Sequence, residues 1–148
     1  MTNSYSWSRS RDLCEQAGHD LVSIESYGEW SFLSQTIQTL ETKEYSIGLK
    51  KDISSREWRW ISDNSTVNAS SKGAWPWAPN QPSSTNSENC TQMYKTLGGS
   101  GRYNDIPCDR GLKLAGYICE RSPECTVRKG GLENSQSLQK NDCKYSAL

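Results

Sequence analysis

The strongest pattern in the sequence lies at residues 88–120, which read ENCTQMYKTLGGSGRYNDIPCDRGLKLAGYICE. Two runs in this stretch, Thr91–Tyr94 and Tyr103–Ile106, are predicted to be strands. They flank Gly98-Gly99-Ser100-Gly101, whose glycine content is typical of a hairpin turn. A last strand is predicted at Ala115–Glu120. This half of the chain therefore predicts β structure, with three cysteines in or beside the strands.

Two more strands are predicted upstream, where the apolar pattern has a period of two. Tyr45, Ile47 and Leu49 alternate with small residues, and Trp58 and Trp60 flank Arg59. Residues 62–89 are rich in Ser, Asn, Pro and Gly and form a predicted long loop, of a length that is usually functional or disordered. The tryptophans at 58, 60, 75 and 77 are predicted to belong mainly to the core, with a ligand platform as the alternative.

Two helices are predicted in the first forty residues. The first spans Ser8–Ala17, with Gly18 placed to end it in a left-handed cap. The second begins after Ser26, which stands with Glu29 at the spacing of a capping box. Its apolar face is predicted to consist of Trp30, Leu33, Ile37 and Leu40. Between the helices, residues 19–24 are predicted to form either a short strand or an extended connector.

Length and charge limit the class of protein. A chain of 148 residues predicts one domain and a tail. Its 17 basic and 17 acidic residues balance, so it lacks the positive field that a phosphate backbone or an anionic membrane attracts. We therefore expect neither a nucleic-acid partner nor direct membrane insertion. The first 14 residues contain no apolar run, so they predict no signal peptide and no membrane span in this chain.

The cysteines indicate an oxidising compartment. Six cysteines, with no CxxC pair and a single His, fit disulfides better than a metal site. Three sequons, at Asn64, Asn68 and Asn89, are candidate glycosylation sites and favour the same compartment. We therefore expect a secreted protein or the extracellular face of a plasma membrane. Six cysteines allow many pairings, and the residues alone do not choose among them.

Taken in order, eight short motifs resemble the C-type lectin-like domain family over about Tyr5 to Glu120. They are Trp7–Cys14 (WSRSRDLC), Leu21–Ser26 (LVSIES) with Glu29, Tyr45–Leu49 (YSIGL), Trp58–Trp60 (WRW), Trp77–Ser83 (WAPNQPS), Glu88–Cys90 (ENC), Tyr103–Cys108 (YNDIPC) and Gly116–Glu120 (GYICE). Each motif alone is weak, whereas their order together is specific to the family.

The resemblance implies an α+β C-type lectin fold, with two helices packed on small antiparallel sheets and a long irregular loop. It implies the disulfides Cys14–Cys119 and Cys90–Cys108, which leaves Cys125 to pair with Cys143. The lectin-like domain is expected at residues 1–121, followed by a polar, cysteine-containing tail or linker at 122–148. Only Met1–Ser6 precede the first helix, where the family has a strand or hairpin, so we expect a truncated start and an exposed edge on the last strand.

In the family the long loop and a following strand hold calcium, which also binds a sugar. Five residues of this chain occupy the matching positions and are candidates for binding both the calcium ion and the sugar. They are Gln81, Ser83, Glu88, Asn104 and Asp105. Calcium prefers such hard oxygen donors. Pro82 is expected to be cis, since X-Pro bonds adopt this form at low cost. Gln81 matches the galactose-type order of the family, but Ser83 replaces its usual Asp or Asn, which should lower the affinity for calcium.

Two functions from different classes follow from this resemblance. The first is a calcium-dependent module that binds a glycan or glycoprotein. The alternative is a calcium-independent lectin-like receptor domain that binds another protein through its loop and aromatic surface. With one His and no GxSxG, HExxH or nucleotide-binding loop, the sequence shows no assembled catalytic group, so we expect no enzymatic activity.

Overall fold

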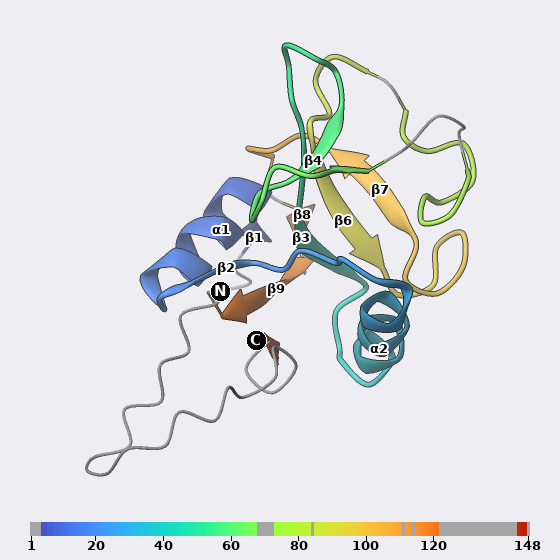
Figure 1. Cartoon of the computed structure of the whole chain (residues 1–148). Helices are drawn as coiled ribbons and strands as arrows, with labels where there is room; N and C mark the ends of the chain where they lie inside the picture. The colour runs from blue at the N-terminus through green and yellow to red at the C-terminus, as the bar shows by residue number, and fades with distance from the viewer. Residues whose placement is uncertain are drawn as a thin grey trace, which may run out of the picture.

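The computed structural model describes residues 4–67, 73–83, 85–110, 112–113, 115–121 and 145–147 (Figure 1). The helices of these residues are α1 (Trp7–Gln16) and α2 (Tyr27–Gln38). The strands are β1 (Ser4–Tyr5), β2 (His19–Leu21), β3 (Glu44–Lys51), β4 (Trp58–Trp60), β5 (Thr66–Val67), β6 (Cys90–Tyr94), β7 (Tyr103–Ile106), β8 (Leu112–Lys113), β9 (Ala115–Arg121) and β10 (Tyr145–Ala147). The α+β class expected from the sequence is confirmed.

Strand β3 is the centre of the sheet. It pairs antiparallel with β4 and β6 and parallel with β9, and β6 in turn pairs with β7 across the predicted hairpin. Gly48 lets β3 approach the segment after β2, because its N–H donates to the Val22 carbonyl at 2.7 Å. A side chain at Gly48 would place its Cβ 2.7 Å from the Leu21 carbonyl oxygen. Glycine is therefore required in the YSIGL motif by close backbone contact.

Both predicted helices are present, with the predicted caps at Gly18 and Ser26 and an N-cap at Ser6 that was not predicted. The Ser6 side chain caps α1, and Gly18 follows its end with φ +76° and donates its N–H to the Glu15 carbonyl. The Ser26 hydroxyl caps α2 by accepting from the Glu29 N–H at 3.2 Å. Local side-chain capping thus determines where each helix starts. Neither of these helices, nor any other described one, is long and apolar enough to cross a membrane.

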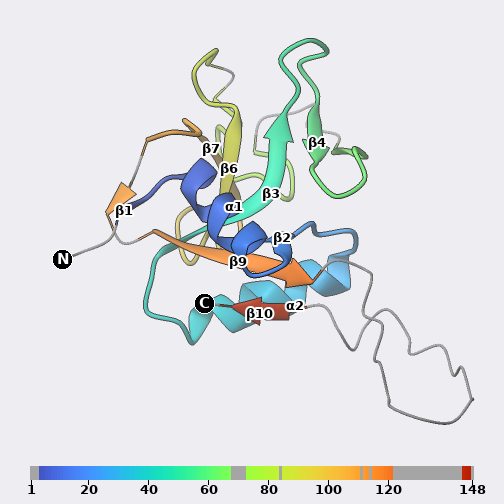
Figure 2. The same cartoon turned by 90° about the vertical axis from the view of Figure 1, so that its left-hand side faces the viewer.

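The two faces of the sheet bury separate apolar clusters. Side chains alternate along β9, so Ile118 lies in one cluster and Cys119 in the other. The larger cluster includes Leu33 and Ile37 of α2, together with buried aromatic residues. The smaller one includes Trp7 and Cys14 of α1. The helices consequently lie on opposite sides of the sheet, as Figures 1 and 2 show.

The expectation of an exposed edge on the last strand is wrong. The short strand β1 pairs with β8, not with β9, and contacts β9 through the rings of Tyr5 and Tyr117. Instead β10 lies antiparallel along β9, where Ser146 is opposite Cys119, while β2 occupies the other edge with Leu21 opposite the same residue (Figure 2). An unpaired edge exposes backbone donors and acceptors. The three residues of β10 pair with those of β9, so this edge is covered. The assignment of 122–148 to a tail or linker stays a prediction.

The long loop contains more order than its composition indicated. Strand β5 pairs with β4, and Trp77 forms an isolated bridge with Tyr103. Trp58, Trp60 and Trp77 are buried at 4%, 5% and 0% exposure, which confirms them as core residues. Trp75 is 45% exposed, so its assignment to the core is wrong. The Trp75 ring contacts Tyr27 and Trp30 at the surface. The bridge to Tyr103 is made by Trp77, and only the ring of Trp77 is directed into the core.

Candidate functional site

The structure brings three of the five predicted ligands into direct contact. Strand β7 carries Asp105, whose partner in the β6–β7 register is Thr91. The long loop crosses this strand and carries Ser83 and Glu88. The Ser83 hydroxyl contacts both carboxylates, at 2.8 Å from Asp105 Oδ2 and closer still to Glu88 Oε2. The hairpin and the loop thus converge at one cluster of oxygens.

Asp105 anchors the cluster from within the fold. It is 1% exposed, and its two carboxylate oxygens accept from the Ser83 backbone N–H at 2.8 and 2.9 Å. A buried carboxylate requires such hydrogen bonds, because burial of an unpaired charge is costly. These bonds fix the loop directly after Pro82, whose peptide bond with Gln81 is cis as predicted.

The cluster has fewer hydroxyl hydrogens than close contacts between oxygen atoms. The Ser83 hydroxyl carries one hydrogen, yet its oxygen lies in contact with both Glu88 and Asp105. The Thr85 hydroxyl supplies one more, to Glu88 Oε2 at 2.9 Å. At least one contact therefore brings two electron-rich oxygens together without a hydrogen between them. Such a cluster attracts a cation.

The remaining predicted ligands adjoin the cluster residues in sequence, with Gln81 two residues before Ser83 and Asn104 directly before Asp105. Gln81 Oε1 is shut off from solvent and accepts no hydrogen bond from the described residues. Asn104 donates its Nδ2 to the Tyr94 hydroxyl at 2.9 Å, so its amide nitrogen is engaged with β6. The two side chains therefore offer carbonyl oxygens, of which that of Gln81 is a buried acceptor in need of a partner.

The donor set is made of oxygens only and carries two negative charges. Among the described residues, no three His, Cys, Asp or Glu side chains come together. The cluster thus depends on amide and hydroxyl oxygens beside its two carboxylates, which suits calcium better than a transition metal. Sequence reasoning missed Thr85. Its one signal is a hydroxyl two residues after Ser83 and three before Glu88.

The neighbouring Tyr94 is held in its neutral form. Burial, followed by the negative charge of Glu44, raises the pKa of Tyr94 to about 12. Burial also raises the pKa of Tyr103, on the next strand, well above its ordinary value. Both phenols are therefore protonated at neutral pH.

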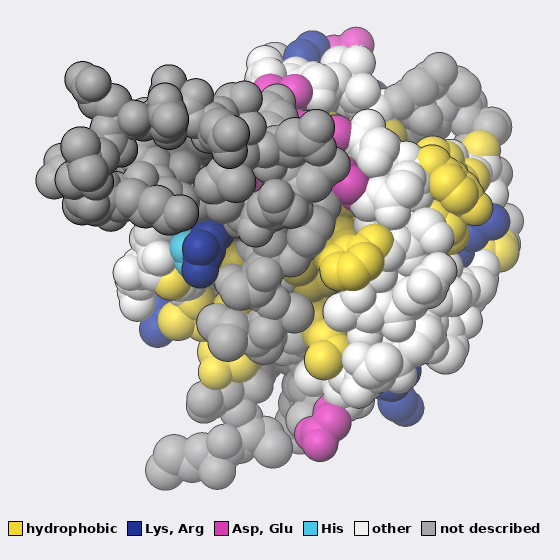
Figure 3. Space-filling model, turned by 60° about the horizontal axis from the view of Figure 1, so that its bottom comes forward, with side chains coloured by type: hydrophobic (Ala, Val, Ile, Leu, Met, Phe, Trp, Pro, Cys, Tyr) yellow, Lys and Arg dark blue, Asp and Glu magenta, His cyan; other side chains and the backbone are white. Residues whose placement is uncertain are grey.

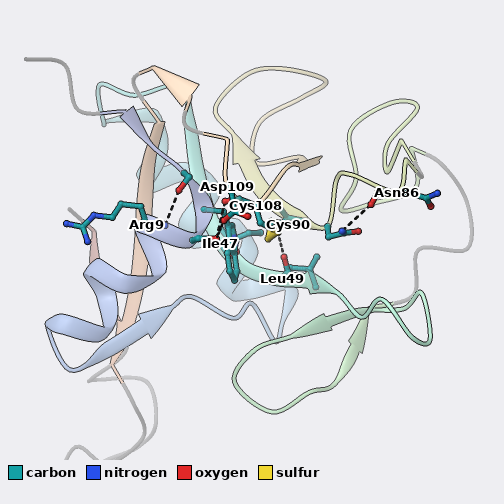
Figure 4. The surroundings of a disulfide bond; sticks show 12 residues. Arg9, Ile47, Leu49, Asn86, Cys90, Cys108 and Asp109 are labelled. Atoms are coloured by element: carbon teal, nitrogen blue, oxygen red, sulfur yellow. Dashed lines mark hydrogen bonds between the residues drawn. A yellow bond between two sulfur atoms is a disulfide. The ribbon is translucent and has the colours of Figure 1, made fainter.

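A disulfide fixes the base of the site. Cys90–Cys108 joins β6 to the end of β7, and Cys14–Cys119 joins α1 to β9, so both pairings implied by the resemblance are confirmed. Figure 4 shows Cys90 between the core strand and the loop that carries Asn86. The third predicted bridge, Cys125–Cys143, lies outside the described residues.

The sequons differ in their surroundings. Asn64 is exposed in the turn between β4 and β5, where its backbone has φ +63°. Asn89 is half-buried and donates its Nδ2 to the Asn86 carbonyl at 3.3 Å. Asn68 lies outside the described residues. Glycosylation at all three stays a prediction, with Asn64 in the most accessible position of the two that are described.

Comparisons with known proteins agree with this architecture. A family model described as the Lectin C-type domain matches residues 3–121. The human low affinity immunoglobulin epsilon Fc receptor is 36% identical over 121 residues, which are 81% of this chain and 33% of that protein. Human C-type lectin domain family 17, member A is 31% identical over 120 residues, which are 81% of this chain and 28% of that protein. The chain thus spans a third or less of these relatives.

Solved structures show the same fold. The C-type carbohydrate-recognition domain of cow CD23, crystallised in the presence of a GlcNAc2Man3 oligosaccharide, is 31% identical with a TM-score of 0.59, and the match covers 80% of this chain and 81% of that one. The C-type lectin domain of murine dendritic cell inhibitory receptor 2, in complex with an N-glycan, is 30% identical with a TM-score of 0.58, and the match covers 80% and 84%.

The fold and the oxygen cluster define a recognition module built on a disulfide-linked α+β scaffold. This chain belongs to the C-type lectin domain family. Members of the family are binding modules rather than enzymes, in agreement with the expectation from the sequence.

Proposed function

We propose that this domain is an extracellular carbohydrate-binding module that uses a calcium ion held by Gln81, Ser83, Glu88, Asn104 and Asp105. The observation that carries the proposal is the contact of the Ser83 hydroxyl oxygen with both carboxylates, only one of which can receive its hydrogen. The unpartnered buried oxygen of Gln81 adds a second reason for a cation here. The two disulfides favour the oxidising environment outside the cell.

Each residue has a defined task in this proposal. When bound, calcium would accept neighbouring sugar hydroxyls as ligands while its charge is balanced by Glu88 and Asp105. Asp105 fixes the loop through the Ser83 N–H, and the Thr85 hydroxyl orients Glu88. Gln81 and Asn104 supply neutral carbonyl oxygens. With two carboxylates in the set, we expect a weak to moderate affinity for calcium.

The chemical class of the ligand is supported by the structural relatives. Two related domains were crystallised with a GlcNAc2Man3 oligosaccharide or an N-glycan. Gln81 before Pro82 instead matches the galactose-type order of the family. We therefore propose glycan binding as the function and a preference for galactose-type sugars as its finer, separately testable form.

A thermal melt tests whether the domain binds calcium. The oxidised protein is heated with about 5 mM calcium and again with excess chelator, because an ion that binds only the folded state stabilises it. A dissociation constant of about 50 μM would add about 2.7 kcal/mol at that concentration, which raises the midpoint by several degrees. Glu88→Gln should abolish the gain. The matched control is Glu41→Gln, which changes an exposed carboxylate after α2 in the same way and should preserve it.

A sugar-affinity column then tests glycan binding. Retention on galactose, mannose or N-acetylglucosamine resin, and release by chelator, are expected for the wild type and for Glu41→Gln but not for Glu88→Gln. Preferential retention on galactose would support the finer proposal, and preferential retention on mannose would refute it. Coincident melts with and without calcium, together with no retention, would refute the calcium-dependent function itself.

One observation favours the alternative of calcium-independent protein binding. Tyr27, Trp30 and Trp75 form a surface cluster with ring centroids 5.5–5.6 Å apart, and Tyr27 is 66% exposed. Figure 3, which views the end of the molecule where α2 lies, shows separate hydrophobic side chains at the surface among uncharged groups. Exposed aromatics are enriched at protein interfaces. Trp75→Ser would then abolish a partner contact that chelator leaves intact.

A further inference from the structure

The segment that carries Thr85 and Glu88 is attached to the β3–β4 hairpin at three points. The Lys51 backbone N–H donates to the Asn89 carbonyl at 2.8 Å. The Lys51 ammonium donates to the Thr85 carbonyl at 3.2 Å. The Arg56 guanidinium donates to the Asn86 side-chain oxygen at 2.9 Å. A loop of otherwise irregular backbone is thereby linked to a different part of the sheet.

Lys51 is itself held in place by the core. Its ammonium lies 5.3 Å from the centroid of the Trp58 ring, which is 4% exposed and packs against Trp77 with a centroid distance of 5.0 Å. The ring attracts the cation and restricts the directions that the long side chain can take. Lys51 therefore transmits the rigid position of the tryptophans to the Thr85 carbonyl.

Thr85 connects this attachment to the oxygen cluster. Its carbonyl accepts from Lys51, and its hydroxyl donates to Glu88 Oε2 at 2.9 Å. Glu88 in turn contacts the Ser83 hydroxyl. A shift of Thr85 would therefore displace the Glu88 carboxylate. Since Glu88 is one of two carboxylates in the cluster, half of the negative charge of the cluster would be misplaced.

The backbone of Arg56 gives a second, independent reason to assign a role to the hairpin. Arg56 has φ +61°, a conformation that glycine or asparagine adopts at much lower cost than arginine. The turn needs this conformation, because the Arg56 N–H donates to the Asp52 carbonyl at 2.8 Å. Because an arginine is costly in this conformation, its presence points to a task for its side chain, and the bond to Asn86 supplies one.

We propose that Lys51 and Arg56 are positioning residues, which hold Thr85 and Glu88 in the geometry that the calcium ion and the sugar need. This inference rests on the proposed function and adds two residues on the β3–β4 hairpin that contact neither ligand. Affinity in this domain is thus set partly by a second hairpin, outside the loop and strand that supply the oxygens.

The experiment compares Lys51→Met and Arg56→Gly with the wild type. Lys50→Met is the matched control: it removes the same charge one residue away, where the ammonium lies 5.8 Å from the Trp7 ring instead of the loop. The affinities for calcium and for the retained sugar are measured by titration calorimetry. Amide hydrogen exchange of residues 85–88 is measured in chelator, where no ion contributes.

We expect Lys51→Met and Arg56→Gly each to weaken calcium and sugar binding by about three- to tenfold, the usual effect of one lost hydrogen bond. The exchange of residues 85–88 should become faster in both variants. Arg56→Gly should melt no lower than the wild type in chelator, since glycine suits the positive φ. Lys50→Met should match the wild type in all three measurements.

The result that would overturn the inference is unchanged affinity and unchanged exchange in Lys51→Met and Arg56→Gly, or an equal change in Lys50→Met. A wild type that binds neither calcium nor sugar would refute the proposed function instead. The exchange of residues 85–88 would then still show whether the two residues hold the loop.

Discussion

Ser83 is the residue at which this chain departs from the sugar-binding pattern that it otherwise resembles. An acidic or amide side chain usually follows the proline, and here a hydroxyl contacts Glu88 and Asp105. Without an ion, one hydroxyl hydrogen between two carboxylates relieves their repulsion better than a third carboxylate could. Under the proposed function, the serine would stabilise the ion-free domain and lower its affinity for calcium.

A substitution at this position tests the balance. Ser83→Asp should raise the calcium affinity about tenfold, because it adds a third carboxylate to the proposed ligands and the affinity increases with their negative charge. It should lower the stability in chelator by about 1–3 kcal/mol, since three carboxylates then meet at a partly buried site. Urea unfolding with and without calcium measures both effects. Ser83→Asn, which adds an oxygen without charge, should show little loss in chelator. Equal losses in the two variants would contradict the charge argument.

At the scale of single residues, the sequence singled out Ser83, Glu88 and Asp105, which the structure brings together, but it did not show their contacts. Glu88 and Asp105 were found because they occupy fixed places in recognised motifs. Thr85 and Lys51 were missed, because their roles depend on contacts between segments that are 34 residues apart. Such contacts follow from the path of the long loop, for which the sequence offers no periodicity.

Among the elements, β6 and β7 combine the candidate site with two buried tyrosines. Burial of the phenol is the first cause that raises both pKa values, that of Tyr94 to about 12 and that of Tyr103 well above its ordinary value. A raised pKa means that the folded state favours the protonated phenol. The two tyrosines therefore make their full contribution to the free energy of unfolding below pH 10, the ordinary tyrosine pKa. This contribution is lost as the pH rises toward and through their pKa values in the folded state.

Alkaline unfolding tests this consequence. The wild type should lose stability progressively between pH 10 and about pH 12, and its phenolate absorbance should rise together with unfolding. Tyr94→Phe removes one titrating group and the bond from Asn104. It should be less stable at neutral pH and show a weaker loss above pH 10, as circular dichroism at several pH values would reveal. Parallel curves for the two proteins would exclude a role for Tyr94.

The elements themselves were largely predictable where short-range chemistry determines them. The helices begin at Ser6 and Ser26, and Gly18 ends the first, because capping needs only neighbouring residues. The strands β6 and β7 follow from their glycine-rich turn. Strands β5 and β10 were not predicted, because each has only two or three residues and shows no apolar alternation of its own. The pairing of β10 also depends on Ile118–Glu120, which lie far from it along the chain.

For the whole molecule, the two disulfides have different tasks. Cys14–Cys119 spans 105 residues and joins α1 to β9, whereas Cys90–Cys108 spans 18 and joins the strands next to the candidate site. The chain-entropy model assigns about 4.8 kcal/mol to the longer loop and about 3.2 kcal/mol to the shorter one. The longer bridge should therefore contribute more to global stability, since it restricts most of the unfolded chain.

Paired alanine variants separate the two tasks. Cys14→Ala with Cys119→Ala should lower the free energy of unfolding by about 1.5 kcal/mol more than Cys90→Ala with Cys108→Ala. Calcium affinity should show the reverse order, because the shorter bridge joins β6 to the end of β7, the strand that carries Asp105, whereas the longer one joins α1 to β9. Urea unfolding and calcium titration of both variants measure the two rankings. If both quantities fell in the same order, stability of the fold alone would determine the affinity, and the short bridge would have no separate effect on the site.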